Sequence, residues 1–277
     1  MGQTPKMIKS LPLIPALLVS CCLLSTSNEI RARTILTEGL ESFDFAVRVQ
    51  AIAAAGMVGS NDAMVVRIQG FLKDKNVKVR LAAVHALADL RAPQSKAGLQ
   101  KVLIEDTAPE VSFAAAKALA TLEDPEGTTV LMDVYDRKRK TRSTLLEQKK
   151  RSFFDEFHSP QSTLLFLMSQ GIGYVPVPGA GDGYSAISEL LKDPELSDRA
   201  QVLFLLTRTK NQESLALLDR ALHDGDWSVR AAATQIIAQT AWTEFRDSLI
   251  PLFEDKNYRV RLRAAGAYLH LSLVDNH

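Results

Sequence analysis

Small and apolar residues recur at steps of three and four along much of this chain, in short stretches separated by polar turns. Residues 63–91 show the pattern clearly. Their second half opens at Asn76, a residue type that caps helices, and then places Val79, Ala83 and Leu87 on one helical face. The pattern predicts two short helices joined by a tight turn. Because helices this short are marginal alone in water, the pair needs neighbours.

The same two-helix unit returns along the chain at steps of 32 residues in the first half and 31 in the second. Aligned on one residue pair, the copies read Val47-Arg48, Val79-Arg80, Val111-Ser112, Asp198-Arg199, Val229-Arg230 and Val260-Arg261. An Asp recurs six positions before the Arg, at Asp74, Asp106, Asp193, Asp224 and Asp255, with Ser42 in the first copy. Four positions after the Val stand Ala51, Ala83, Ala115, Val202, Ala233 and Ala264. Because independent columns agree at one period, the sequence predicts an all-α solenoid.

These residues resemble short HEAT-like repeats of the kind found in phycobilisome-lyase-related proteins. The resemblance is carried by Asp-(x)5-Arg within Asp74–Arg80 and by the small and apolar run that follows at 81–87. It implies a ladder of ion pairs between adjacent repeats, formed by Asp74, Arg80, Asp106, Asp193, Arg199, Asp224, Arg230, Asp255 and Arg261. It also implies interruptions of the ladder where the columns change, at Ser42, Ser112 and Asp198. We expect Arg80→Ala to lower stability by up to ~1 kcal/mol, the value of an exposed pair.

The N-terminal segment 1–24 has the features of a targeting signal. Lysines at 6 and 9 precede an apolar run at 11–24 that is too short to span a bilayer comfortably. The segment resembles a bacterial export signal, and Leu18–Cys21 resembles a lipobox, which implies a lipid on Cys21 and an envelope protein held at the membrane. Ordinary cleavage and an uncleaved anchor stay open as alternatives. Residues 25–33 are interpreted as a short tether.

The rest of the chain divides into repeats and an irregular middle. Three repeats are expected in 34–126 and three more in 184–277, with the last acting as a polar cap. Between them, 127–183 starts a repeat and then loses the pattern. This middle region contains a basic cluster and then, from 159 to 181, an uncharged insert rich in Gly and Pro. The predicted design is three repeats, an insert and three repeats.

The basic cluster is the main candidate for a charged binding site, and it consists of Arg137, Lys138, Arg139, Lys140, Arg142, Lys149, Lys150 and Arg151. It could bind phosphates of nucleic acid or of lipid headgroups. The plainer interpretation, a solvated helix face, is favoured. Export disfavours nucleic acid, and a net charge of +1 gives no overall attraction for it. The insert at 159–181 is interpreted as an apolar loop over the groove or the seam between the halves, or as a hairpin that dips into a membrane.

No residue pattern indicates catalysis, a metal or a cofactor. Both cysteines lie in the N-terminal segment, so the folded body has no disulfide and no cysteine metal site. The glycines match no phosphate-binding motif. No histidine is followed by Glu, as the iron-binding hydroxylases among the relatives require.

Taken together, the sequence indicates a non-catalytic scaffold. Its concave face, lined by the second helices, is expected to bind an unknown protein or peptide; positions to consider there are Arg48, His85, Gln201 and Gln235. Two alternatives stay open. One is a peripheral membrane protein that uses the basic cluster and the insert, and the other is an enzyme like the lyases or hydroxylases among the relatives.

Overall fold

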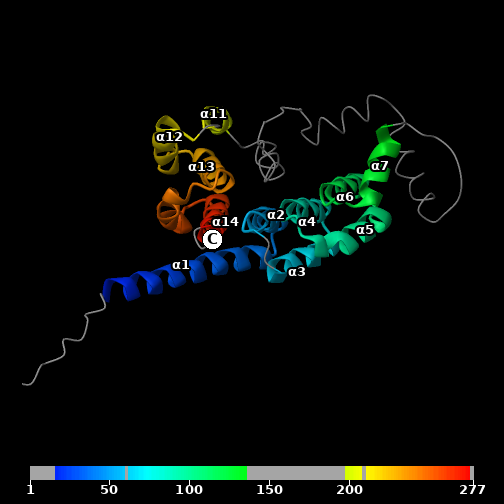
Figure 1. Ribbon diagram of the computed structural model, residues 1–277, viewed down its shortest axis with the longest axis horizontal. Helices are drawn as coiled ribbons and strands as arrows, with labels where there is room; N and C mark the ends of the chain where they lie inside the picture. Colours follow the sequence, from blue (N-terminus) through cyan, green and yellow to red (C-terminus); the bar gives the residue numbers. More distant parts are fainter. Residues whose placement is uncertain (1–15, 60–61, 136–196, 208–209, 275–277) are drawn as a thin grey trace, which may run out of the picture.

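The computed structural model describes residues 16–59, 62–135, 197–207 and 210–274, which form helices joined by short turns (Figure 1). Within these ranges there is no β-strand. The helices stack as antiparallel pairs into one curved row, so the predicted all-α solenoid is confirmed.

The helices follow the repeat pattern. In the N-terminal half the first helices are α1 (Ala16–Glu41), α3 (Asp62–Gly70) extended by η1 (Phe71–Lys73), α5 (Lys96–Glu105) preceded by η2 (Pro93–Ser95), and α7 (Pro125–Tyr135). The second helices there are α2 (Phe45–Gly56), α4 (Val77–Asp89) and α6 (Pro109–Thr121). The C-terminal half has second helices α11 (Asp198–Leu206), α13 (Trp227–Gln239) and α14 (Tyr258–Val274). Its first helices are α12 (Gln212–Leu222) and the pair η3 (Thr243–Phe245) and η4 (Asp247–Glu254).

Local chemistry sets both ends of the second helices. The Asn76 side chain accepts the N–H of Lys78 at 2.9 Å and so caps α4, as the sequence predicted. At the other end, the residue eleven positions after the Arg column has a positive φ, at Gly59, Arg91, Glu123 and Ala241. A residue in this conformation ends a helix and turns the chain back. The second helices of these four repeats therefore end at the same register.

The small-residue column forms the centre of the core. Ala51, Ala83, Ala115, Ala233 and Ala264 are all fully buried, as predicted. Their small size lets each second helix approach its first helix closely: a Cβ added to Gly39 in α1 would lie 2.9 Å from the Cβ of Ala51 in α2. Close packing of this kind leaves no space for an extra methyl group.

The order of the helices in space differs from their order in the sequence. Helix α14 packs against α13 on one side and against α1 and α2 on the other. The row of second helices therefore runs α11, α13, α14, α2, α4 and α6, and the first helix α7 packs against α6 at its end (Figure 1). The sequence led us to expect that the C-terminal repeat caps the solenoid. This prediction is wrong, because α14 is covered by other helices on both sides. Residues 136–196, which include the predicted insert, lie outside the described residues.

The contact of α14 with α1 and α2, called the seam below, is as tight as a core. A Cβ added to Gly266 would lie 2.5 Å from the carbonyl oxygen of Ala54 in α2. Side chains from the first helices reinforce the seam. Arg31 in α1 bonds to Glu254 at 2.8 Å and stacks over the ring of Phe253 at 5.7 Å. The two halves are thus joined by direct packing of their helices.

The predicted tether at 25–33 is wrong. These residues belong to the continuous helix α1, and Ala32 is fully buried against the rest of the core. The physical reason is that α1 serves as the first helix for α2 and also covers α14, so it needs more turns than one repeat supplies. No helix in the part of the chain that the structure describes is long and apolar enough to cross a membrane.

Because Gly266 has no space for a side chain, Gly266→Ala is expected to destabilise the protein by about 1–3 kcal/mol through overpacking at the seam. The matched control is Gly70→Ala in α3, where an added Cβ meets nothing within 4 Å. The control should be neutral or stabilising by up to ~1 kcal/mol, since Ala is the better helix former. Urea unfolding of both variants tests the seam, and equal midpoints would contradict it.

Candidate functional site

The most organised polar feature is a ladder along the turns between first and second helices. The Asp of each turn has three roles. Asp255 accepts the N–H of Asn257 at 2.8 Å and so closes its own turn. Its two carboxylate oxygens accept Nε and Nη2 of Arg230 from the preceding repeat, at 2.6 and 2.8 Å. Its carbonyl oxygen accepts Nη1 of Arg261, from the second helix of its own repeat, at 2.6 Å. The Asp255 turn is therefore held by two arginines.

The same geometry recurs along the row. Arg80 donates to the carboxylate of Asp106 at 2.7 and 2.9 Å and to the carbonyl oxygen of Asp74 at 2.9 Å. Arg48 pairs with Asp74 at 3.2 Å. Arg48 was considered for the concave face, but the structure assigns it to the ladder, and its position in the Arg column already indicated this. Where Ser112 replaces the Arg, its hydroxyl donates instead to the carbonyl oxygen of Asp106 at 3.3 Å.

One expected interruption does not occur. Arg199 pairs with Asp224 through two hydrogen bonds even though Asp198 departs from the Val column. Arg199 stays 66% exposed, and its pair is the most solvated of these rungs. Asp193 lies outside the described residues.

The ladder keeps its charges near neutral pH. The hydrogen bond from Arg199 is the largest cause of the lowered pKa of Asp224. Burial alone would raise the pKa of Asp255, but hydrogen bonds from Arg230 and from the N–H of Asn257 outweigh it and lower the pKa overall. The pKa of Arg230 is raised by its hydrogen bond to Asp255. These are stable ion pairs, and none of the shifts produces a group that titrates near pH 7.

The inner surface of the row is formed by the side of each second helix that faces away from its first helix. Val49, Leu81 and Phe113 occupy the same column on α2, α4 and α6 and are partly exposed there. His85 lies one turn further along α4 and is also partly exposed. Gln235, which was expected on this face, is buried. The side chain of Gln201 is outside the description.

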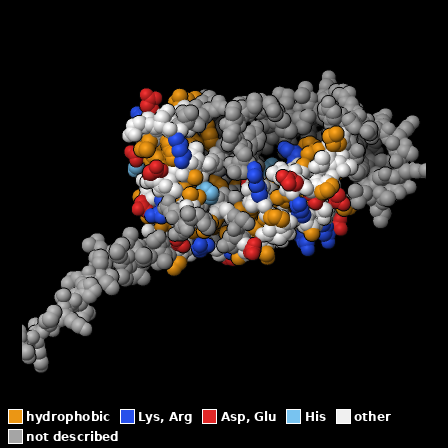
Figure 2. Space-filling model, in the orientation of Figure 1, with side chains coloured by type: hydrophobic (Ala, Val, Ile, Leu, Met, Phe, Trp, Pro, Cys, Tyr) orange, Lys and Arg blue, Asp and Glu red, His pale blue; other side chains and the backbone are white. Residues whose placement is uncertain are grey.

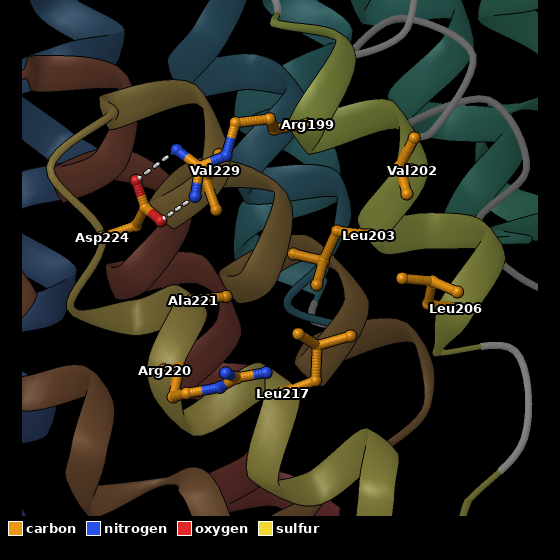
Figure 3. A pocket seen from close by; sticks show the side chains of 9 residues that line it. All are labelled: Arg199, Val202, Leu203, Leu206, Leu217, Arg220, Ala221, Asp224 and Val229. Carbon is orange, nitrogen blue, oxygen red and sulfur yellow. Dashed lines mark hydrogen bonds and ion pairs between the residues drawn. The ribbon is translucent and has the colours of Figure 1, made fainter.

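A groove of about 470 Å³ lies at the far end of the C-terminal half, between α11, α12 and α13 (Figure 3). It is lined mainly by apolar side chains, and the Arg199–Asp224 pair closes one side. Val202 and Leu206 are 48% and 59% exposed there. In α4 and α13 the same two columns are fully buried. In the other repeats, the residue in the column of Val202 faces the first helix of its own repeat. The groove therefore lies on the face of α11 on which a first helix would pack.

Other predicted sites lie beyond the description. The whole basic cluster, Arg137 to Arg151, and the insert at 159–181 fall outside the described residues. The backbone of Cys21 is part of α1, and its side chain lies outside the description. Within the described ranges, no group of three His, Cys, Asp or Glu side chains could hold a metal. On the described part of the face in Figure 2, acidic and basic side chains are interspersed.

Stacked helix pairs with an ion-pair ladder define this chain as an α-helical repeat protein. A family model described as HEAT repeats matches residues 33–103, 64–147 and 185–269, which together make up more than half of the chain. The chain belongs to the HEAT repeat family, and the resemblance noted in the sequence is confirmed.

Two solved structures are similar to this chain. Human deoxyhypusine hydroxylase in complex with glycerol is 14% identical with a TM-score of 0.34, over 91% of this chain and 99% of that one. A designed armadillo repeat protein is 16% identical with a TM-score of 0.25, over 85% of this chain and 98% of that one. A comparison with curated proteins gave no match.

The burial of the ladder changes the stability expected of its rungs. Side chains of Arg80 and Asp106 are only 13% and 5% exposed, so removing one partner leaves a buried charge. We therefore expect Arg80→Ala to lower stability by about 3–5 kcal/mol, more than a surface pair would. Arg199→Ala, at the exposed rung, is the matched control and should change stability little. The two variants are compared by thermal and urea unfolding, and similar losses would show that burial does not decide the effect.

Proposed function

We propose that this protein is a non-catalytic scaffold that binds another protein or peptide along the inner surface of its solenoid. The observation that carries the proposal is the aligned apolar column of Val49, Leu81 and Phe113 on three consecutive second helices. HEAT repeats commonly present such extended surfaces to a partner. The fold alone does not assign a function, so the argument depends on this column.

The ladder supports this role because it fixes the spacing between repeats. The pairs Arg48–Asp74 and Arg80–Asp106 join the same three repeats that carry the apolar column. An extended partner with apolar residues at regular intervals could therefore contact successive helices without reordering them, which lowers the entropic cost of binding. In the C-terminal half the same column is buried at Ala231 and Leu262. The binding surface is accordingly assigned to α2, α4 and α6.

A photo-crosslinking residue placed at Leu81, on the inner surface, is expected to give a discrete crosslinked product in cells. The control is the same residue at Val66, a largely exposed position on the first helix α3. Val66 should give weak or diffuse products, because it lies on a first helix, away from the proposed surface. Mass spectrometry of the Leu81 product would identify the partner. Equal products from both positions would contradict the inner surface as the binding face.

We also propose that the scaffold works in the bacterial cell envelope, held by a lipid on Cys21. Support comes from the charged, apolar and Cys pattern of residues 1–24. In the structure, the backbone of Cys21 is part of α1. The same helix contains Arg31, which contacts the C-terminal half at the seam. A lipid at this residue would therefore be joined to the solenoid by a helix, and the body would be held at a short distance from the membrane.

Cell fractionation and intact mass of the wild type and Cys21→Ser test the anchor. The wild type is expected in the membrane fraction with the added mass of a diacylglycerol group, and Cys21→Ser is expected without either. An unmodified wild-type protein in the soluble fraction that retains residues 1–24 would overturn both the anchor and the envelope location.

A further inference from the structure

One ladder arginine has no carboxylate partner. Arg261 has the same pose as Arg80 and Arg230: its Nη1 donates to the carbonyl oxygens of Asp255 and Lys256, at 2.6 and 3.2 Å. In Arg80 and Arg230, Nε and Nη2 then hold a carboxylate of the next repeat. Across the ranges that the structure describes, Nε and Nη2 of Arg261 form no hydrogen bond or ion pair.

The residue in the place of the missing partner is Ser42. At the seam the repeat that follows α14 in space is the first repeat, and Leu262 packs onto Gly39, three residues before Ser42. The Ser42 hydroxyl accepts the N–H of Asp44 at 3.2 Å, as the carboxylate of Asp74 accepts the N–H of Asn76 at 2.8 Å. Ser42 thus closes its turn but is too short to reach an arginine. As far as the structure describes it, the seam therefore lacks the carboxylate that a complete rung has.

The open edge of Arg261 suits a carboxylate in particular. Its Nε and Nη2 atoms are absent from the buried nitrogen atoms that have no partner, so they reach solvent. Two parallel N–H groups of a guanidinium bind the two oxygens of a carboxylate in a fork, as the rungs at Arg80 and Arg230 show in this molecule. The acidic Asp44 two residues from Ser42 favours a singly charged ligand over a doubly charged phosphate.

An exposed aromatic residue stands in the same turn as Ser42. Phe43 directly follows Ser42 and is fully exposed, and Phe45 is 41% exposed. None of the other five repeats has an aromatic residue in the place of Phe43; they have Lys75, Thr107, Pro194, Gly225 and Lys256. Aromatic and arginine side chains are the residue types that most often dominate binding energy at interfaces. The seam therefore combines an arginine whose Nε and Nη2 have no partner among the described residues with a turn that exposes a phenylalanine.

We propose that the seam, through Arg261, Ser42 and Phe43, binds an Asp or Glu side chain of a partner peptide that has an apolar residue next to the acid. The partner's carboxylate completes the ladder at the seam, and its apolar neighbour covers Phe43. This proposal deepens the proposed scaffold function and rests on it. It also adds a second contact point, on the edge of the turns, to the inner surface of α2, α4 and α6.

Selection of random displayed peptides on the full chain, followed by binding measurements on purified variants, tests the proposal. We expect the wild type to select peptides that share an Asp or Glu beside an apolar residue. Replacing that acid by Asn or Gln should weaken binding by about tenfold or more, the range of a hydrogen bond to a charged group. Arg261→Gln should weaken binding similarly. Arg220→Gln, on the exposed face of α12, is the control and should leave binding unchanged.

Ser42→Asp keeps the test independent of folding. Its new carboxylate should occupy the fork of Arg261, raise the melting temperature and remove acidic-peptide binding by about tenfold or more. Unchanged binding to Ser42→Asp would overturn the proposal, as would the absence of selected acidic peptides. Wild-type stabilisation by inorganic phosphate without acidic-peptide binding would also overturn it, in favour of a small-anion site. If selected peptides depend on Leu81 but not on Arg261, this proposal fails while the scaffold function stands.

Discussion

The architecture depends on one repeated interaction, an arginine that holds two successive turns together. In each complete rung the guanidinium binds the carbonyl oxygen of its own turn and the carboxylate of the next one. A buried charge without a partner is very unfavourable, so each pair admits a single spacing between repeats. Apolar packing of alanine columns supplies most of the attraction between helices. The ladder selects the register at which that packing takes place.

The helices at the seam pack as consecutive repeats do, but one residue of the ladder differs. Packing of Gly266 on α2 and of Leu262 on α1 reproduces the contact between consecutive repeats, although these segments lie at opposite ends of the chain. Only the carboxylate is missing, at Ser42. The two halves therefore form one continuous row whose weakest polar link lies in its middle. The seam also carries an arginine fork without a carboxylate from the described part of the chain and a turn with two exposed phenylalanines, so the interruption of the ladder is the place where an external carboxylate has most to contribute.

Local and periodic features could be predicted from the sequence, whereas non-local ones could not. Asn76 as a cap and Ala83 as a core position follow from spacing along one helix, and the structure shows both. The pairing of Arg80 with Asp106 follows from a constant repeat length. The position of α14 beside α2 has no local signal, since nothing in either helix names the other as its neighbour. The extent of α1 was missed for the same reason: residues 25–33 are helical because they cover a distant segment, and Gln235 is buried by packing that its own helix does not reveal.

The seam also shapes how this chain reaches its native state. Arg31 and Glu254 are 223 residues apart in the sequence, yet they bond directly. Contacts of such long range are slow to form, because closing a long loop precedes any gain from the contact. During synthesis at roughly 5–20 residues per second, the edge of α2 stays uncovered until the last 17-residue helix, α14, has emerged. The N-terminal repeats must therefore remain soluble with an apolar edge open until α14 has been synthesised and has packed against it.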